Sequence, residues 1–365
     1  MGTDFSSLVD AIKRDIKNDL TILKDVEFWI PTGCPSLDIK LGGGWPVGRL
    51  STAIGKKSAG KSSLIAKAIA ETQRIGGVGV WLDVEKSAWE KRSIAMGVDP
   101  SRLIFAQPES LDTFELILPD GTKEKRLGAF DLLESITWVT RKHSPAMPVT
   151  IVIDSIAGAS VASEMEGDTG DATMGKHARI VSQGLRKVMG FVHEFNICLI
   201  FVNQLKQKIG VMYGSPDTYI AQNPIDFHSA ITMQITQHEC WPDAKKKETA
   251  EGIVSKINIT KNKVADPFKE AYTRVFFDRG VDTLYETIET LIEYGKLEWG
   301  GGFITFDGKK RRKKEFYEMA SVDPAIKESL FKEVDQLIRN ETGKKGNTYF
   351  SEGATKRPVR APVAA

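Results

Sequence analysis

The amino-acid sequence predicts an α/β fold with a largely parallel, twisted sheet and helices on both of its faces. Between about residues 31 and 277, short β-branched runs alternate with longer amphipathic stretches, which is typical of strands joined by crossover helices. A glycine-rich phosphate-binding motif joins one of these runs to the stretch that follows it. A helix and a strand precede this core, and a small α+β region follows it.

The composition is that of an ordinary globular protein. The chain has 365 residues, enough for two or three domains of about 150 residues each. Lys and Arg number 50 and Asp and Glu 48, and 41% of the residues are hydrophobic and 27% charged, a balance that excludes disordered, collagen-like and disulfide-framework proteins. The apolar run at 197–202 is too short to span a bilayer, so we expect no membrane association. Cys34, Cys198 and Cys240 lack metal-site spacing, which favours a reducing, cytoplasmic location.

Residues 1–30 are predicted to form an arm that contains one helix and one strand. Apolar residues recur at helical spacing between 5 and 23, and a short extended segment follows at 26–30. One helix and one strand cannot bury themselves. We therefore expect this arm to pack on a neighbouring surface, either of its own chain or of another subunit.

Residues 31–282 are predicted to form the core, in which strands and helices alternate. The expected strands are 50–54, 78–82, 103–106, 150–153, 198–202 and 230–235, and the expected helices are 62–74, 89–96, 130–142 and 176–195. An insertion at 117–128 has Pro119-Asp120-Gly121 at its turn and is expected to be a loop or a hairpin.

Beyond residue 283 the pattern changes to helix, a glycine-rich turn at 300–302, an aromatic strand at 303–306 and further helix. We expect a small C-terminal α+β domain at 283–340, followed by a flexible basic tail at 341–365.

The motif at 55–62 fits G-x-x-x-x-G-K-[ST] and lies between an apolar strand and an amphipathic helix. Its residues, with the next one along the chain, are Gly55, Lys56, Lys57, Ser58, Ala59, Gly60, Lys61, Ser62 and Ser63. The glycines let backbone N–H groups point at phosphate oxygens, and the helix N-terminus adds a positive dipole end. Lys61 would neutralise the β- and γ-phosphates, and Ser62 would bind Mg²⁺. The alternative is a glycine turn with exposed lysines.

Polar residues end three of the predicted strands, at the edge of the sheet where a phosphate loop needs carboxylates. Asp154 is predicted to bind Mg²⁺, because a carboxylate that ends an apolar strand is costly to bury without a cation or hydrogen bonds. Glu85 is predicted to orient the attacking water, and Gln204 to sense the γ-phosphate. The alternatives are a strand-ending turn acid for Asp154, a solvated loop acid for Glu85 and a strand-capping amide for Gln204.

Two segments, 164–175 and 205–223, are predicted to be long loops on the same side of the sheet, where ligands bind in open α/β folds. Arg179 and Arg186 share the polar face of the helix between them, and with Lys206 and Lys208 they could meet phosphates. Met174 and Ile209 could insert between bases. The alternative for the two arginines is a solvated basic stripe.

Several strings spread along the chain identify it as similar to the bacterial and phage RecA-type recombinase family. They are Ser36-Leu-Asp-Ile39, the phosphate motif, Trp81-Leu-Asp-Val-Glu85, Gly97-Val-Asp99, Ile153-Asp-Ser155, Glu166-Gly-Asp168, Met174-Gly175, Ser182-Gln183, Phe201-Val-Asn-Gln204, Lys208-Ile-Gly-Val-Met-Tyr-Gly214, Lys261-Asn-Lys263 and Pro267-Phe268-Lys269. The resemblance implies a RecA-like P-loop ATPase core and extends from the arm to about residue 340.

The resemblance implies a DNA-dependent ATPase that uses ATP and Mg²⁺, forms a helical filament on single-stranded DNA and catalyses homologous strand exchange in recombination, repair and the SOS response to DNA damage. It makes Glu85 the catalytic carboxylate and Asp154 with Ser155 the Walker B pair, and it makes Gln204 the link between the γ-phosphate and the DNA loop. Lys261 and Lys263 would reach the neighbouring subunit's ATP, and Phe227 and the arm would form other filament contacts.

The resemblance also implies a set of DNA-binding residues. They are Met174, Arg179, Ser182, Arg186, Lys206, Lys208, Ile209, Gly210, Val211, Met212 and Asn223. The basic run at 309–314 would gather double-stranded DNA, whereas by pattern alone it could be a solvated turn or a nuclear signal.

The sequence departs from the family at four places. Arg92 stands where the family commonly has an adenine-stacking Tyr, and Trp89 replaces a nearby acid. Ala221-Gln222-Asn223-Pro224 lacks the paired glycines of the second DNA loop, the insertion at 117–128 is unusual, and the tail is basic rather than acidic.

Two other functions remain open at this point. A RecA-fold core could drive a ring-shaped DNA motor such as a helicase, although the arm and the small C-terminal domain favour open filaments. The chain could instead be an ATP-binding regulator without DNA-stimulated hydrolysis, although a pure binder has no use for a water-orienting acid such as Glu85.

Overall fold

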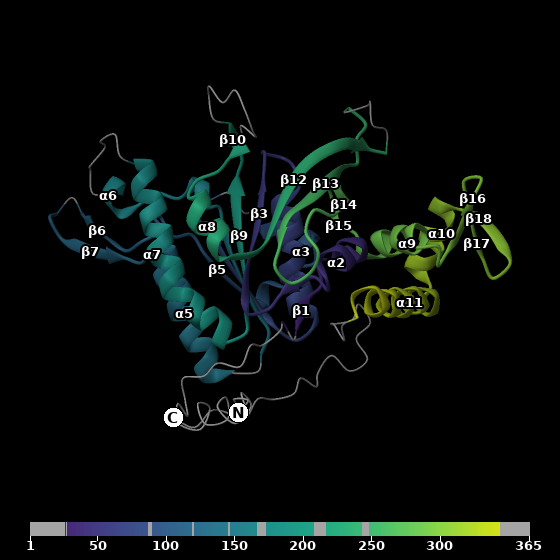
Figure 1. The fold of residues 1–365 in the computed structure, drawn as a ribbon, viewed down its shortest axis with the longest axis horizontal. Coiled ribbons are helices and arrows are strands. Elements are labelled where there is room, and N and C mark those ends of the chain that lie inside the picture. The colour runs from purple at the N-terminus through teal and green to yellow at the C-terminus, as the bar shows by residue number, and fades with distance from the viewer. Residues whose placement is uncertain are drawn as a thin grey trace, which may run out of the picture.

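The protein is described by a computed structural model that covers residues 26, 28–86, 90–118, 120–144, 147–165, 173–207, 217–242 and 248–343. The predicted arm helix, the middle of each predicted DNA loop and the C-terminal tail lie outside the described residues. A large central sheet carries helices on both faces, and a small sheet with its own helices lies at one end of the molecule (Figure 1).

The central sheet has nine strands in the order β15-β14-β13-β12-β3-β9-β8-β4-β5. Its parallel strands are β3 (Arg49–Gly55), β4 (Val78–Asp83), β5 (Leu103–Ala106), β8 (Val149–Asp154), β9 (Ile197–Gln204) and β12 (Ser229–Trp241). The antiparallel strands are β13 (Gly252–Asn262), β14 (Glu270–Phe276) and β15 (Gly280–Val281). The predicted α/β class and parallel core are confirmed. The antiparallel strands β13 and β14 were not predicted, because polar residues such as Ser255, Lys256 and Thr273 interrupt their apolar positions and no continuous apolar run marks them.

The strands β3, β4, β8 and β9 each contribute to two hydrophobic clusters, because successive side chains point to opposite faces of the sheet. In β9, Cys198, Ile200 and Val202 pack on one face with α2 (Pro35–Leu41) and α3 (Lys61–Arg74). The alternate residues of β9, which include Leu199 and Phe201, pack on the other face with α5 (Ala129–His143) and α7 (Thr173–Glu194). The two layers of helices therefore hold the strand ends in fixed positions.

The connections are short elements. They are β1 (Trp29–Ile30), β2 (Trp45–Pro46), α4 (Glu90–Ala95), η1 (Pro100–Arg102), β6 (Phe114–Ile117), β7 (Lys123–Arg126), η2 (Ile156–Gly158), α6 (Ala162–Met165), β10 (Lys206–Gln207), β11 (Asp217–Thr218) and α8 (Gln222–His228). The insertion is a β6–β7 hairpin whose turn has Gly121 at a φ of 83°. β1 pairs with β2 of the same chain, so this part of the arm lies on its own core.

The C-terminal part has its own hydrophobic cluster, which contains Ile304, Phe316 and Val334, and Ile39 of α2 joins it. Its elements are α9 (Thr283–Glu293), β16 (Glu298–Gly300), β17 (Phe303–Phe306), β18 (Lys309–Arg312), α10 (Lys313–Val322) and α11 (Pro324–Thr342). Asp282 and Asp323 cap α9 and α11 by accepting hydrogen bonds from backbone N–H groups of their first turns.

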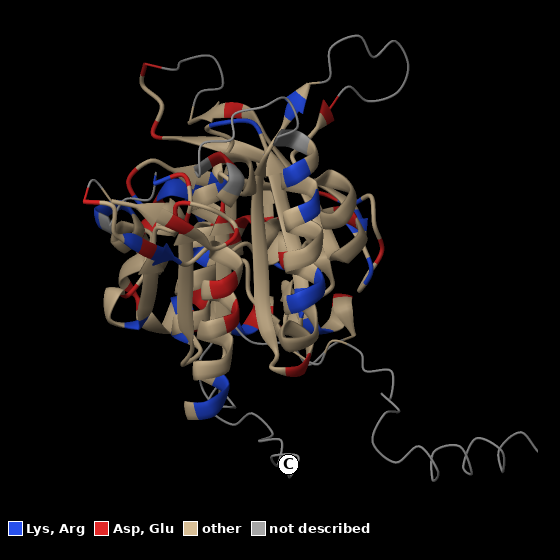
Figure 2. Cartoon of the chain, turned by 90° about the vertical axis from the view of Figure 1, so that its left-hand side faces the viewer, with Lys and Arg blue, Asp and Glu red and all other residues tan. Residues whose placement is uncertain are grey.

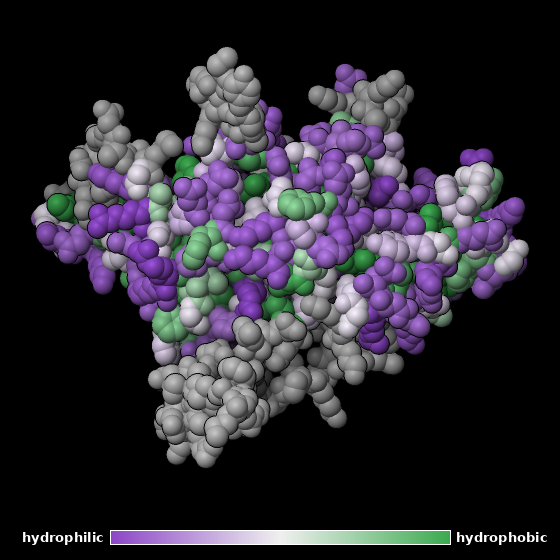
Figure 3. Space-filling model, viewed as in Figure 1, coloured by the Kyte–Doolittle hydropathy of each residue, from purple (hydrophilic) through white to green (hydrophobic). Residues whose placement is uncertain are grey.

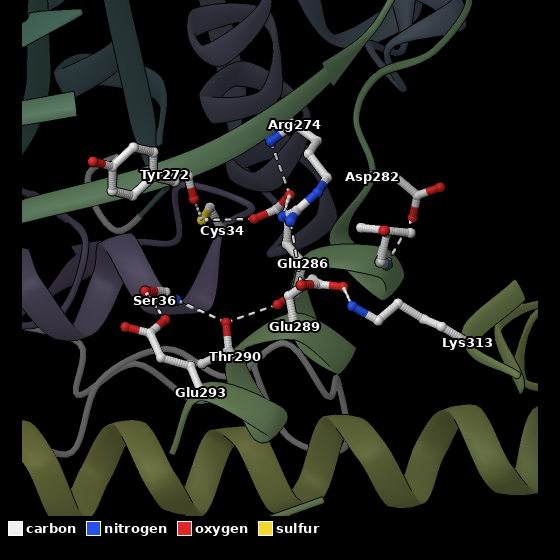
Figure 4. Close-up of polar contacts among 11 residues, drawn as sticks. Cys34, Ser36, Tyr272, Arg274, Asp282, Glu286, Glu289, Thr290, Glu293 and Lys313 are labelled. Atoms are coloured by element: carbon white, nitrogen blue, oxygen red, sulfur yellow. Dashed lines mark hydrogen bonds and ion pairs between the residues drawn. The ribbon is translucent and has the colours of Figure 1, made fainter. Parts of the chain in front are cut away.

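A buried polar cluster connects the core to the C-terminal part (Figure 4), and we call Cys34, Arg274, Glu286, Glu289 and Lys313 the joint. Glu286 accepts hydrogen bonds from the Arg274 backbone N–H (2.9 Å) and the Cys34 thiol (3.2 Å). Glu289 binds the Arg274 guanidinium (3.2 Å) and the Lys313 ammonium (2.6 Å). Burial raises the pKa of Glu286 to about 7, and the Arg274 charge and the hydrogen bonds offset only part of this effect.

The surface is largely hydrophilic in the view of Figure 3, with apolar areas that are separate from one another. The most exposed large apolar side chains include Phe268 (82%), Val322 (80%) and Phe227 (75%). Among the residues that the structure describes, no helix is both long and apolar enough to cross a membrane.

Candidate nucleotide and nucleic-acid site

The predicted phosphate loop connects β3 to α3, and its backbone conformation requires glycine. Gly60 has a φ of 92°, and a Cβ at this position would lie 2.7 Å from the Ser255 hydroxyl oxygen. A Cβ at Gly55 would lie 2.2 Å from the carbonyl oxygen of Ile235. Both positions therefore exclude any larger residue. Lys56, Lys57, Ser58 and Ser62 are exposed, whereas Ala59, Lys61 and Ser63 are buried, so the outer side of the loop is open to a ligand.

Lys61 is folded back onto the loop. Its ammonium donates hydrogen bonds to the backbone carbonyls of Gly55 (2.9 Å) and Lys56 (2.7 Å). Burial lowers the pKa of Lys61, while Asp154 and Glu85 act in the opposite direction. A buried ammonium that is hydrogen-bonded to two neutral carbonyls is suited to bind a polyanion, because an added negative charge would favour its charged form.

Asp154 ends β8 beside this loop and is 4% exposed. Its carboxylate accepts a hydrogen bond from the Ser62 hydroxyl (3.2 Å). Burial, followed by the charge of Glu85, raises the pKa of Asp154 to about 7. A divalent cation between the Asp154 carboxylate and the Ser62 hydroxyl would offset the free-energy cost of burying this carboxylate in its ionised form. Hard oxygen ligands of this kind suit Mg²⁺. The described residues hold no group of three or more His, Cys, Asp and Glu side chains that could bind a metal without other ligands. These two residues therefore fit Mg²⁺ that is shared with phosphates and water.

Glu85 follows β4 and meets residues from two neighbouring strands. It accepts hydrogen bonds from the Ser155 hydroxyl, after β8, and from the Gln204 side-chain amide, at the end of β9. The structure thus brings together Glu85, Ser155 and Gln204, as expected for the carboxyl ends of adjacent parallel strands.

Gly158, which the sequence analysis missed, makes room for Glu85. A Cβ on Gly158 would lie 2.4 Å from Cγ of Glu85. Because Gly158 lies in the short helix η2, where its φ is not unusual, no local pattern indicates this packing requirement.

Asn203 was also missed. It is fully buried, and its side-chain amide donates to the carbonyl of Ile220 (2.8 Å), while its side-chain oxygen accepts from the Gln204 backbone N–H (3.0 Å). β10 and β11 pair with each other at the two ends of the second predicted loop. The segment that returns from this loop is therefore fixed beside Gln204. A polar residue at the end of an apolar strand is the signal that could have indicated this role.

Lys261 and Lys263 do not approach the phosphate loop of their own chain. In the sheet register Lys261 pairs with Thr232, which pairs with Thr52, whereas Gly55 lies further along β3. Their ammonium groups instead contact α8, where Lys261 donates to the carbonyl of Asp226 and Lys263 donates to that of Phe227 (3.2 Å).

Lys and Arg positions recur along the helix α7, as the blue bands on its ribbon show (Figure 2). Arg179 and Arg186 are exposed, and Arg186 donates to the Ser182 hydroxyl (3.0 Å). Lys206 is exposed on β10, Asn223 is exposed in the first turn of α8, and Arg92 is exposed on α4. The remaining candidates, namely Trp89, the side chain of Met174, Lys208, Ile209, Gly210, Val211 and Met212, lie outside the described residues.

The basic run at 309–314 is divided between two environments. Lys313 binds Glu289 in the joint, and the Arg311 guanidinium donates to the carbonyl of Phe306 (3.3 Å). Lys310 and Arg312 are exposed in β18 and share one face of the small sheet with Phe303, according to the strand register. Lys309 and Lys314 are also exposed.

Comparison with known proteins agrees with this arrangement. The family described as the RecA N-terminal domain matches residues 17–282. Protein RecA of Aquifex aeolicus (strain VF5) is 33% identical over 348 residues, which cover 93% of each chain. Protein RecA of Aquifex pyrophilus is 34% identical over 341 residues, 90% of this chain and 91% of that one. Protein RecA of Synechococcus sp. (strain CC9902) is 35% identical over 280 residues, 76% of this chain and 68% of that one. The chain therefore belongs to the RecA family of recombinases.

Proposed function

We propose that this chain hydrolyses ATP with Mg²⁺ at the 55–63 loop and couples that reaction to a helical filament on single-stranded DNA that pairs and exchanges homologous strands. As a member of the RecA family it is an ATP-hydrolysing DNA recombinase of recombination and repair. The convergence of Glu85, Ser155 and Gln204 beside the phosphate loop is the observation that carries the more specific proposal.

In this proposal the loop residues bind the phosphates of ATP through backbone N–H groups, and the Lys61 ammonium leaves its two carbonyl acceptors for the phosphate oxygens. Ser62 and Asp154 hold Mg²⁺, which supplies positive charge at the phosphates when bound. Arg92 is exposed on α4 and would stack on the base, with Trp89 as the second candidate.

Glu85 orients the attacking water and accepts its proton. The water oxygen forms a bond to the γ-phosphorus as the bond to the β,γ-bridging oxygen breaks, which releases ADP and phosphate. Ser155 and Gln204 both donate to Glu85, which supports a fixed carboxylate orientation before substrate binds. Because Gln204 also precedes the second DNA loop, we assign it the link between the γ-phosphate and DNA.

Lys261 and Lys263 are assigned to the ATP of a neighbouring subunit. Their separation from their own phosphate loop and their position beside the exposed Phe227 support a role across an interface. Hydrolysis would then require assembly, which is the expected property of a filament whose interfaces are heterologous.

Single-stranded DNA is assigned to α7 and the two loops. Arg179 and Arg186 on α7 and Lys206 on β10 are exposed cations, and these can neutralise phosphates. Double-stranded DNA is assigned to the small sheet, where Lys310 and Arg312 share an exposed face with Phe303. The three cysteines are buried and free, which supports a reducing, cytoplasmic setting.

The decisive experiment measures ATP hydrolysis with and without single-stranded DNA at about 50 and about 200 mM salt. We expect DNA to stimulate hydrolysis, and the higher salt to weaken that stimulation because phosphate contacts release counterions. The substitution Lys61→Ala should abolish ATP hydrolysis. Equal rates with and without DNA would favour the regulatory alternative and overturn the proposal. Electron microscopy that shows closed rings and never filaments would favour the helicase-like alternative.

A further inference from the structure

His177, in the first turns of α7, has no role in the function described so far and is 7% exposed. Its Nε2 lies 2.7 Å from the carbonyl oxygen of Ala159. Because a carbonyl oxygen only accepts, Nε2 carries the hydrogen of this bond. The other ring nitrogen, Nδ1, lies 3.9 Å from the carboxylate of Glu164. One rigid side chain therefore connects α7 to the segment that precedes α6.

Ala159 directly follows the residues that hold the catalytic carboxylate. The Ser155 hydroxyl donates to Glu85 and accepts from the backbone N–H of Gly158 (3.3 Å), at the end of η2. Gly158 in turn packs against Glu85, where a Cβ would lie 2.4 Å from Cγ. Contacts therefore continue from Glu85 through η2 to Ala159 and from there to His177.

The segment from Ala159 to Glu164 is fixed from its other side as well. The backbone N–H of Ala162 donates to the Asp112 carboxylate (2.8 Å), and that of Leu111 donates to the carbonyl of Ser160 (3.0 Å). The Glu164 carboxylate accepts from the backbone N–H of Val161 (3.3 Å). Asp112 lies at the base of the inserted β6–β7 hairpin, so the segment is held between this hairpin and α7.

We infer that His177 is a positioning residue that makes the DNA affinity of α7 depend on the state of the nucleotide site. A change in the hydrogen bonds of Glu85 would move η2 and Ala159, and the bond from Nε2 would pass this movement to α7, which carries Arg179 and Arg186. The inference rests on the proposed function, because it takes those arginines as DNA contacts. It gives the inserted hairpin a role too, as the support for the moving segment.

The test compares two amide variants of the full-length protein. In His177→Gln the side-chain nitrogen can take the place of Nε2, whereas the shorter side chain of His177→Asn reaches only the place of Nδ1. His143→Asn is the matched control, because His143 is an exposed histidine at the end of α5. Fluorescence anisotropy with a labelled oligothymidylate gives the ratio of DNA affinities in the presence of ATPγS and of ADP.

We expect His177→Asn to reduce this affinity ratio by about five- to tenfold, which lies in the usual range for coupling between two sites. His177→Gln should retain most of the ratio, and His143→Asn should leave it unchanged. The KM for ATP without DNA should not change in any of the three. A merely structural role for His177 would lower both DNA affinities equally and leave their ratio intact.

Failure of the inference can be distinguished from failure of the proposed function. If the parent protein binds DNA equally well with both nucleotides, or if Arg179→Ala and Arg186→Ala bind as tightly as the parent, the proposed function is wrong. If the parent shows the ratio and the arginine variants lose affinity, but His177→Asn retains the parental ratio, the assignment of His177 is overturned.

Discussion

Asp154 beside the phosphate loop and Glu286 in the joint are both buried carboxylates, and burial raises the pKa of each to about 7. Their partners differ. Glu286 has a guanidinium, a thiol and a backbone N–H around it, and all of these belong to the same chain (Figure 4). Asp154 accepts a hydrogen bond from one hydroxyl, and two further carboxylates, Glu85 and Asp83, raise its pKa, while the charge of Lys61 opposes them only in part.

The comparison shows how a structural and a functional acidic cluster can be distinguished. In the joint, positive charge is built in and is enclosed, since Arg274 lies between Glu286 and Glu289 and over the rings of Trp241 and Tyr285. At the phosphate loop, three carboxylates gather at the strand ends, and the charge of Lys61 offsets only part of their repulsion, so that a bound Mg²⁺ would be needed to offset the rest. We therefore expect variants of the first cluster to change stability and variants of the second to change catalysis.

The largest effect is expected for Glu85→Gln, which removes the proton acceptor but keeps the shape. ATP turnover should fall by roughly 10²- to 10⁴-fold, the usual contribution of a general base. The free energy of unfolding should not fall, because the loss of one carboxylate relieves repulsion with Asp154. Steady-state hydrolysis and chemical denaturation measure the two effects, and turnover at the parental rate would remove the role assigned to Glu85.

Arg274→Ala in the joint should have the opposite effect to Glu85→Gln, a loss of stability without a loss of turnover. It leaves Glu286 and Glu289 without their shared cation, so the free energy of unfolding should fall by about 3–5 kcal/mol. Hydrolysis per folded molecule should stay near that of the parent. Lys123→Ala, which removes an exposed ion pair with Glu115, is the control and should cost at most about 1 kcal/mol. Equal losses in the two variants would contradict the difference between buried and exposed pairs.

The pH dependence of stability should distinguish the two carboxylates. The pKa of Glu286 is raised from its usual 4.5 to about 7, so the folded protein retains this proton when the unfolded chain has lost it. The stabilisation that this proton provides is complete below about pH 4.5 and is lost as the pH rises to about 7, with a total of about 3 kcal/mol.

Denaturant unfolding at several pH values measures the slope of the unfolding free energy against pH. Glu286→Gln should make the slope shallower both with and without magnesium and ADP. Asp154 also contributes to the change of the unfolding free energy with pH. This contribution should shrink when magnesium and ADP are added, because a bound cation favours the ionised carboxylate. A slope that is the same in the parent and in Glu286→Gln would refute the assignment to Glu286.

The smallest effect is expected for Gly158→Ala. The added methyl carbon would lie 2.4 Å from Cγ of Glu85, closer than van der Waals contact allows, and would displace Glu85. Turnover should therefore fall by about tenfold, while the joint and its stability contribution stay intact. Gly190→Ala in α7 is the matched control, because a Cβ there meets no atom within 4 Å. A full rate for Gly158→Ala would show that Glu85 tolerates displacement.

The elements of the parallel core and the phosphate loop could be predicted because their signals are local. The apolar run of β9, the periodicity of α7 and the glycines at 55 and 60 each describe a conformation of neighbouring residues. The basic run at 309–314 shows the limit of such signals. Its six residues are alike in sequence, yet Lys313 is used in the joint, while Lys310 and Arg312 face solvent.

The sequence by itself determined the α/β class, the order of the core elements, the family and the position of the nucleotide motif. Only the tertiary structure decided that Glu85 meets Ser155 and Gln204, that Glu286 is buried with Arg274, and that His177 contacts Ala159. The physical reason is that helices, turns and strand faces follow from the conformational preferences of adjacent residues. Contacts between residues far apart along the chain depend instead on strand order and on how the layers pack.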